Sequence, residues 1–249
     1  MPRPSLSVQL YTVRDAIAAD ADGTLARLAQ LGFRNVEPYD LPAFAPVLEP
    51  ALAAHGLAAP TSHASLVGEA DLDAALAAAS ALGVEILIEP AVMPERWGDR
   101  DAIAAVASEL AEAARRAADH GMRVGYHNHH WETEIRIDGA HAIEVFADLL
   151  PDDVALELDT YWAAVGGADP VALLERLGER VAAIHVKDGP VTSDTSQQQP
   201  AGQGELPIRE ILAAAPNARP VLEFDEYAGD LFDGLAAGVE FVTELGVEA

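Results

Sequence analysis

The stretch YHNHHWE, residues 126–132, places three of the chain's eight histidines within four positions. Imidazoles beside a glutamate are suited to metal binding or to proton transfer. The alternative is a solvated surface run, above all at His130. Which interpretation holds depends on the reactive groups that the fold brings to His127 and His129.

Polar side chains also stand at the ends of other short apolar segments. Continuous apolar runs are typical of strands that helices cover on both faces. We predict strands at residues 6–10, 35–37, 58–62, 85–89, 123–127, 154–159, 182–186 and 220–224. The groups at or just after their carboxyl ends are Gln9, Glu37, His63, Glu89, His127 with His129, Asp159, His185 with Lys187, and Glu223 with Asp225. The turns at the opposite strand ends are mainly glycine and apolar residues, so chemistry is expected at one end only.

The segments between these strands predict helices. Residues 101–120 place Ile103, Val106, Leu110, Ala113 and Ala117 on one face at helical spacing. Glycines at 32, 56, 83 and 121 mark helix ends directly before strand-like runs. Eight strand–helix units in one undivided chain of 249 residues predict an α/β fold, a single (β/α)8 TIM barrel over residues 1–249. A doubly wound open sheet is the structural alternative, but no GxGxxG follows the first strand.

Composition excludes several classes of function. The absence of cysteine rules out disulfides and thiolate metal sites, and the net charge of −26 argues against nucleic acid or anionic membranes as partners. No apolar run reaches the roughly 20 residues of a membrane span, and no signal peptide is recognisable. We therefore expect a cytoplasmic protein that acts on a small molecule.

The strand ends meet at one mouth in a barrel, and this predicts a cation there. So many carboxylates and imidazoles would repel one another without one divalent metal ion, for which Mn, Mg, Co or Zn are suitable. Residues two apart on a strand share a face, which pairs His127 with His129 and His185 with Lys187. Glu157 pairs with Asp159 in the same way but lies deeper, where we expect a structural role. Trp131, Tyr161 and Trp162 are candidates for sugar stacking or for core and lid packing.

Several motifs together resemble a known family. SVQLYTVRD, VGYHNHHWE, ELDTYWAAVGGADP, IHVKDG, GQGELP and LEFDE occur in this order between about residue 5 and residue 245. They are similar to the sugar phosphate isomerase/epimerase family of the xylose-isomerase-like TIM barrel superfamily. The resemblance implies the fold and the superfamily more strongly than it implies a substrate.

The resemblance also implies a set of metal ligands. The superfamily's usual set is Glu, Asp, His and Glu, and the last three match Asp159, His185 and Glu223. The place of the first glutamate is held by His127, which we expect as the fourth ligand, and His129 then matches a substrate-contacting histidine. Because that glutamate is also a base in isomerases and epimerases, the second base stays open among Glu37, Glu89, Glu132 and His129.

These observations predict a divalent-metal-dependent isomerase or epimerase that removes a proton next to a carbonyl of a sugar or keto sugar. Glu223 would be the base, Lys187 would steady an oxyanion, and His129 would assist. The expected substrate contacts are Gln9, Glu37, His63, His129 and Trp162. A dehydratase or lyase acting on a keto sugar or inosose is the main alternative. A non-catalytic sugar-binding barrel and a phosphodiesterase of the endonuclease branch are less favoured.

The substrate is expected to lack a phosphate. The chain has no P-loop and no basic cluster near the last strands, and only the glycines of GQGE offer backbone N–H donors to an anion. Members of the family are often dimers or tetramers, which leaves a homo-oligomer open.

Overall fold

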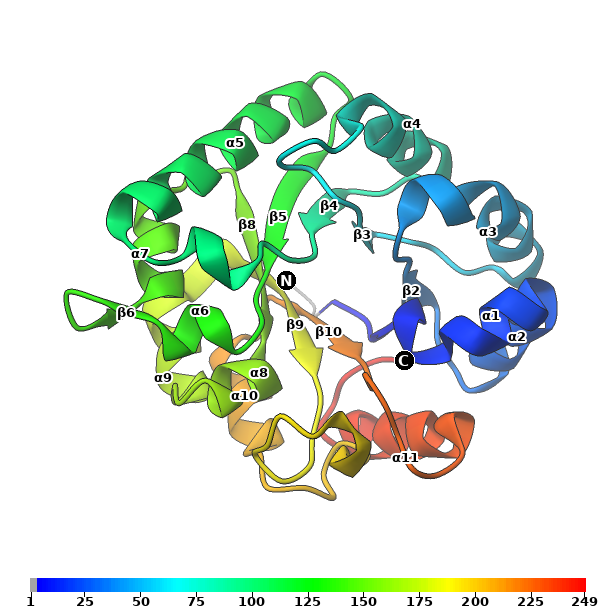
Figure 1. Cartoon of the computed structure of the whole chain (residues 1–249). Helices are drawn as coiled ribbons and strands as arrows, with labels where there is room; N and C mark the ends of the chain where they lie inside the picture. The colour runs from blue at the N-terminus through cyan, green and yellow to red at the C-terminus, as the bar shows by residue number, and fades with distance from the viewer. Residues whose placement is uncertain (1–3) are drawn as a thin grey trace.

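The structure is a computed structural model and describes residues 4–249. Within that range eight parallel strands form one sheet in the order β2-β1-β10-β9-β8-β5-β4-β3, curled into a barrel with helices outside (Figure 1). The strands are β1 (Ser7–Gln9), β2 (Asn35–Glu37), β3 (Thr61–His63), β4 (Ile86–Glu89), β5 (Arg123–His127), β8 (Ala155–Asp159), β9 (Val181–Val186) and β10 (Arg219–Leu222). The predicted TIM barrel is confirmed.

The barrel is nearly closed, and its weakest seam joins β2 to β3. An isolated parallel bridge between Asn35 and Ala58 holds the two strands together there. Val36 N donates to Ala58 O at 2.9 Å, and Ala58 N donates to Arg34 O at 3.0 Å. At the other end of the seam, His63 N donates to Pro38 O at 2.8 Å, just past the end of β2.

Helices pack around the barrel and bury their apolar faces against it. They are α1 (Arg14–Ala19), α2 (Ala21–Gln30), α3 (Leu41–His55), α4 (Leu72–Leu82), α5 (Arg100–Ala118), α6 (Trp131–Glu134), α7 (Ala142–Leu149), α8 (Thr160–Val165), α9 (Pro170–Leu177), α10 (Ile208–Ala214) and α11 (Leu231–Glu244). The predicted face of α5 is buried throughout. Gly56 and Gly83 end α3 and α4 in the left-handed conformation, where glycine carries no steric penalty.

Several local features differ from the sequence-based expectation. β1 is shorter at both ends than residues 6–10, and β10 ends at Leu222 and not at residue 224, so Glu223 lies just past the strand. The third strand begins at Thr61 rather than Ala58 and includes His63, so this side chain stands on the strand instead of beyond it. A small antiparallel hairpin, β6 (Arg136–Ile137) and β7 (Ala140–His141), was not expected and follows α6. Short 3-10 turns cover Leu10–Val13, Pro94–Arg96, Gly178–Arg180 and Thr195–Gln197.

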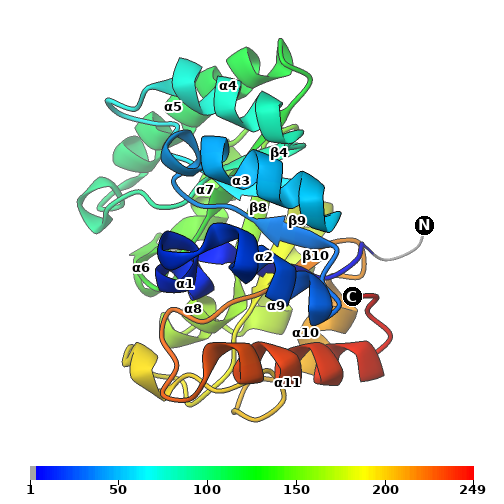
Figure 2. The same ribbon diagram turned by 90° about the vertical axis from the view of Figure 1, so that its right-hand side faces the viewer.

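The barrel has two distinct ends. Leu6 N donates to Glu248 O at 2.6 Å, which ties the start of β1 to the chain's C-terminal segment at one end (Figure 2). The strands run from there towards the opposite end, where the polar strand termini gather. Across residues 4–249, none of the helices has the length and apolar character that a membrane span requires.

Candidate active site

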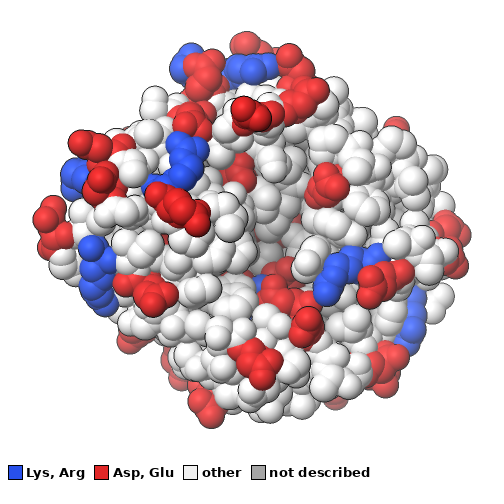
Figure 3. Space-filling view, in the orientation of Figure 1, with Lys and Arg blue, Asp and Glu red and all other residues white. Residues whose placement is uncertain are grey.

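A cavity of about 400 Å³ opens at the carboxyl ends of the strands. Six of the residues expected at the site line it: Gln9, His63, His127, His129, Lys187 and Glu223. Figure 3 shows this face with a central hollow and acidic side chains on its wall and rim. The strand-end rule therefore located the cavity from the sequence.

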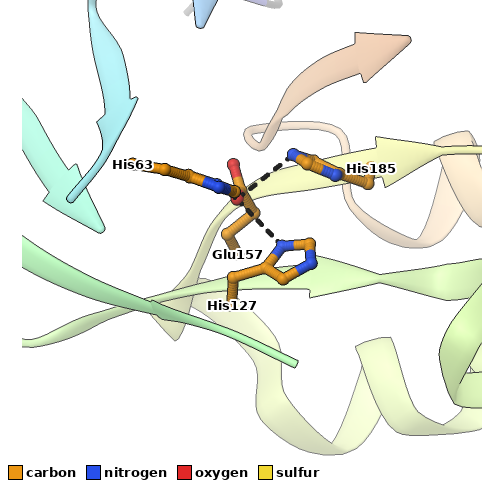
Figure 4. A group of neighbouring side chains, drawn as sticks. All are labelled: His63, His127, Glu157 and His185. Carbon is orange, nitrogen blue, oxygen red and sulfur yellow. Dashed lines mark hydrogen bonds and ion pairs between the residues drawn. The ribbon is translucent and has the colours of Figure 1, made fainter. Parts of the chain in front are cut away.

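Three imidazoles converge on one carboxylate at the floor of the cavity, and we call this set the histidine group (Figure 4). It consists of His63 from β3, His127 from β5, Glu157 from β8 and His185 from β9. Glu157 Oε2 lies 2.6 Å from His63 Nε2, 3.1 Å from His127 Nδ1 and 3.2 Å from His185 Nε2. All four side chains are buried.

Three carboxylates surround one ammonium beside the histidine group, and we call this set the lysine group. Lys187 Nζ donates to Asp225 Oδ2 at 2.8 Å and lies 2.7 Å from Glu223 Oε2. It also lies 2.9 Å from Asp159 Oδ2, although that oxygen accepts no hydrogen bond from the described residues. Lys187 is thus a fixed positive charge next to two of the predicted metal ligands.

His185 belongs to the histidine group and also touches the lysine group. Its Nδ1 lies 2.5 Å from Glu223 Oε2, and its Nε2 lies 2.8 Å from Glu37 Oε1. Gln9 Nε2 donates to the same Glu37 oxygen at 2.8 Å. Asp159, His185 and Glu223 offer ligand atoms within 4.8 Å of one another, so the structure brings these three predicted ligands together.

Charge compensation sets the protonation of the histidine group. Burial alone would lower the pKa of His63, but Glu37 and Glu157 raise it to about 10. Burial and Glu37 would raise the pKa of Glu157, but His185, His63 and His127 bring it down to about 2. Burial and the neighbouring His185 hold the pKa of His127 well below its ordinary value.

Burial and neighbouring charges also set the protonation of the lysine group. Burial would lower the pKa of Lys187, but Asp159, Asp225 and Glu223 raise it well above its ordinary value. Burial raises the pKa of Asp159 to about 6, and Lys187 and His185 oppose that rise. For Glu223 burial is outweighed by Lys187 and His185, which lower its pKa.

His129 forms part of the cavity wall and carries a ring nitrogen, Nδ1, that has no hydrogen-bond partner among residues 4–249. Burial and Lys187 lower its pKa to about 3, so the imidazole is neutral. Its ring stacks on Trp131 with centroids 4.4 Å apart. This packing fixes the ring, whose Nδ1 is buried without a partner among the described residues.

The other carboxylates considered as a second base have local partners. Glu89 accepts hydrogen bonds from the backbone N–H groups of Leu66, Val67 and Ala91. Glu132 accepts from the Tyr126 hydroxyl at 2.7 Å and from His129 N at 2.9 Å. Both support the loops around the cavity and do not line it.

The loop of residues 188–206 is ordered by one carboxylate. Asp188 Oδ1 accepts from Gly189 N and Leu206 N, and its Oδ2 accepts from Gly202 N and Gly204 N, at 2.8–3.1 Å. The N–H groups of the two GQGE glycines are therefore taken by Asp188. The idea that they receive an anion from the substrate is wrong in this structure.

Trp162 and Glu37, both expected to contact substrate, do not line the cavity. Trp162 is buried, and Lys187 Nζ lies 5.7 Å from its ring centroid. The sequence-based list missed Tyr11, Tyr39 and Asp40, which line the cavity opening. Their position two or three residues after Gln9 and Glu37, at the ends of β1 and β2, was the signal that could have found them.

The chain matches the family model for the xylose isomerase-like TIM barrel over residues 8–219. It belongs to that family. No curated protein matches the sequence.

Solved structures with the same fold are distant in sequence. A sugar phosphate isomerase/epimerase from Parabacteroides distasonis is 20% identical with a TM-score of 0.85, over 100% of this chain and 96% of that one. The probable 3-DHS dehydratase AsbF, involved in petrobactin synthesis in Bacillus anthracis, is 14% identical with a TM-score of 0.76, over 96% and 98%. A D-allulose 3-epimerase from Methylomonas sp. is 16% identical with a TM-score of 0.72, over 98% and 99%. At these identities the likeness extends to the fold alone.

The site's donor atoms fit a divalent metal ion. The histidine group and the set Asp159, His185 and Glu223 each offer ligand atoms within 4.8 Å of one another. Buried oxygens next to these atoms, Oε1 of Glu157 and Oε2 of Glu37, accept no hydrogen bond from residues 4–249. Unsatisfied buried carboxylate oxygens are what a bound cation would compensate.

Proposed function

We propose that the chain is a divalent-metal-dependent isomerase or epimerase of a sugar or keto sugar that moves a proton next to a carbonyl. One observation carries the proposal. A carboxylate, an ammonium and a neutral imidazole, those of Glu223, Lys187 and His129, line the same small cavity. Proton abstraction beside a carbonyl requires a base, an oxyanion partner and a hydrogen-bonding group.

Each residue has a role that follows from its surroundings. Glu223 lies at the cavity wall and takes the proton from the substrate carbon. Lys187, held by Asp159 and Asp225, presents a fixed positive charge to the oxygen that becomes negative. His129 presents its neutral imidazole to a substrate hydroxyl, and Gln9 and His63 line the same cavity.

A metal ion held at His185, by the histidine group or together with Asp159 and Glu223, would supply a Lewis acid for the substrate's carbonyl and hydroxyl oxygens. The cavity of about 400 Å³ is within the size range of small-molecule sites. The aromatic rings of Tyr11 and Tyr39 stand at its opening, with centroids 5.3 Å apart. Together these features suit a monosaccharide-sized polyol, and the relatives named for sugar chemistry support that choice.

The substrate is proposed to lack a phosphate. The arginine Arg14 lies near the cavity opening, where its guanidinium donates to the backbone oxygens of Tyr11 and Asp225. The cavity wall contains Asp40, Glu223 and Asp225 against the single lysine Lys187. An excess of carboxylates disfavours an anionic substrate.

Exchange of a carbon-bound hydrogen with solvent tests the proposal. Metal-loaded protein is incubated in D₂O with a panel of ketopentoses, ketohexoses and inososes, and proton NMR follows deuterium entry next to the carbonyl. We expect exchange with at least one substrate, and a rate at least about 100-fold lower for Glu223→Gln. Glu240→Gln, an exposed change on α11, is the matched control and keeps the full rate. The absence of exchange on every sugar, with metal bound, would contradict the proposal and favour a sugar-binding barrel.

A dehydratase or lyase is the second candidate, for a specific reason. Among the described residues Glu223 is the only glutamate that lines the cavity. One base is sufficient for loss of water from a keto sugar, whereas many epimerisations use two. The same NMR experiment separates them, because a dehydratase forms an unsaturated ketone, whereas an epimerase forms a deuterated isomer of the sugar without loss of water.

A further inference from the structure

We propose that the histidine group, His63, His127, Glu157 and His185, is the metal site of this chain, and that the set Asp159, His185 and Glu223 is not. The inference deepens the proposed function, on which it rests for the role of the ion. It assigns the ion's position and its chemical class. Two of its four ligands, His63 and Glu157, are outside the set that the family resemblance implies.

The geometry of the histidine group is close to that of a four-ligand centre. Bonds of about 2.0–2.1 Å to nitrogen and oxygen place tetrahedral ligand atoms about 3.3 Å apart. Glu157 Oε2 lies 2.6, 3.1 and 3.2 Å from the ring nitrogens of His63, His127 and His185. The four ligand atoms all lie within 4.8 Å of one another, so an ion would draw the wider pairs closer together. Each ligand comes from a different strand of the barrel, which makes the site rigid.

Hydrogen bonding alone satisfies the histidine group poorly. His63 Nε2 and His127 Nδ1 must each carry a proton to donate to Glu157 Oε2, while His185 Nε2, 3.2 Å from that oxygen, has its hydrogen bond with Glu37 Oε1. The other oxygen of Glu157, Oε1, is buried and accepts none from residues 4–249. One divalent ion would replace these protons and would compensate the second oxygen as well.

Lys187 decides between the two sets of ligands. His185 has a carboxylate beside each of its ring nitrogens, Glu223 at Nδ1 and Glu37 at Nε2. It could therefore bind an ion of either set through one nitrogen while a carboxylate orients the ring through the other. Asp159 and Glu223 already have a cation, because Lys187 Nζ lies 2.9 and 2.7 Å from their oxygens. A divalent ion between them would lie next to this ammonium. Glu157 has no lysine or arginine ion pair within the described range, so only the histidine group lacks a permanent cation.

Access and chemistry complete the assignment. His63 and His127 line the cavity, so an ion can enter from it and a substrate oxygen can reach the ion. Three imidazoles and one carboxylate favour Zn²⁺ or Co²⁺, whereas a carboxylate-rich set favours Mg²⁺ or Mn²⁺. Glu223, free of the metal, remains available as the base.

Cobalt titration of the metal-free, full-length protein tests the site without any substrate. Chelator-stripped protein is titrated with Co²⁺, and the visible absorption of the bound ion reports its coordination and affinity. We expect intense bands of a four- or five-coordinate, nitrogen-rich centre. We expect His63→Gln and Glu157→Gln to weaken binding by more than about 100-fold and Asp159→Asn by less than about 10-fold. His185→Gln, the ligand that both sets share, abolishes binding in either case and calibrates the assay.

The opposite ranking overturns the assignment. If Asp159→Asn loses the ion while His63→Gln and Glu157→Gln retain it, the ion belongs to the carboxylate set. Failure of the wild-type protein to bind Co²⁺ or Zn²⁺ at micromolar concentration overturns it too. Circular dichroism and thermal unfolding confirm that each variant is folded, and His63→Gln, on the cavity wall, carries the test if the deeper Glu157→Gln unfolds.

The outcome is separable from that of the proposed function. An imidazole-rich Co²⁺ spectrum with no deuterium exchange on any sugar supports this site and refutes the isomerase proposal. Exchange that persists while the ion follows Asp159 refutes this site and supports the isomerase proposal.

Discussion

Two buried carboxylates at the same end of the barrel are compensated in opposite ways. Asp188, in the loop after β9, receives four backbone N–H groups from its own loop and leaves neither oxygen unsatisfied. Glu157, inside β8, accepts only from the imidazoles of His63 and His127 on two other strands, and one of its oxygens receives nothing from residues 4–249. Both side chains are almost fully buried. Burial is therefore the same for the two acids, and they differ in the source of the donors that compensate them.

Backbone donors cannot be exchanged or titrated, so an acid that they satisfy orders a loop. Imidazoles release protons and bind metals, so an acid that they satisfy belongs to a site whose state can change. This contrast leads to four predictions, which follow from the largest expected effect to the smallest.

Replacing Asp188 should produce the largest loss of stability. Asp188→Ala removes the acceptor of four backbone N–H groups, and hydrogen bonds to charged groups contribute about 1.5–3 kcal/mol each before relaxation and water entry reduce the loss. We expect the free energy of unfolding in urea to fall by about 3 kcal/mol. Glu205→Gln, an exposed change in the same loop, should shift it by less than about 0.5 kcal/mol. Equal effects of the two variants would show that Asp188 does not hold the loop.

Metal should stabilise the protein through Glu157 and not through Asp188. An ion that binds only the folded state, present at 100 times its Kd, adds about 2.7 kcal/mol to the free energy of unfolding. We expect this gain on adding Zn²⁺ to the stripped wild-type protein and to Asp188→Ala, and no gain for Glu157→Gln. Thermal unfolding with and without Zn²⁺ measures it. A full gain in Glu157→Gln would show that Glu157 does not bind the ion, and the proposed contrast with Asp188 would no longer hold.

Gly204 should matter because Asp188 leaves no room for a side chain there. A Cβ at position 204 would lie 2.1 Å from Gly189 N and 2.2 Å from Asp188 Oδ1. Gly204→Ala must displace this carboxylate or its donors, and overpacking of that kind costs about 2 kcal/mol. The matched control is Gly98→Ala, where a Cβ would meet nothing within 4 Å. The free energies of unfolding of the two variants, measured in urea, should differ by about 2 kcal/mol.

Most of the fold and part of the candidate site could be predicted from the sequence. β2 and β5 were predicted with their observed bounds, because apolar runs ending at a polar residue mark buried strands and helix-ending glycines mark where they begin. The convergence of Asp159, His185 and Glu223 followed from barrel topology. In each case a local pattern together with one rule of the fold was sufficient.

The source of compensation for Glu157 could not be predicted. Strand alternation places its side chain on the same face as that of Asp159, but His63 is 94 residues away and its ring direction depends on packing. The same holds for the loop, where the pattern GQGE indicates N–H donors without showing that Asp188 uses them. Which side chains meet across the barrel depends on tertiary packing, which no local sequence pattern specifies.

A third buried acid extends the comparison to pH. Glu132 accepts hydrogen bonds from the Tyr126 hydroxyl and from His129 N, and burial raises its pKa to about 8. The folded protein thus keeps a proton that the unfolded chain releases near its ordinary value of 4.5. This group's contribution to stability is complete below pH 4.5 and is lost as pH rises to about 8, at up to about 1.4 kcal/mol per pH unit.

Glu132→Gln isolates that contribution, because the amide keeps an acceptor for His129 N and has no charge to bury. We expect the free energy of unfolding of the wild-type protein to fall more steeply than that of Glu132→Gln between pH 5 and 8. Urea unfolding at pH 5.5, 6.5 and 7.5 measures the difference in slope. Glu205→Gln, exposed and in another loop, should keep the wild-type slope. Parallel curves for Glu132→Gln and the wild type would mean that the pKa of Glu132 is not raised by burial, and that a hydroxyl and one N–H group are sufficient to compensate a buried carboxylate.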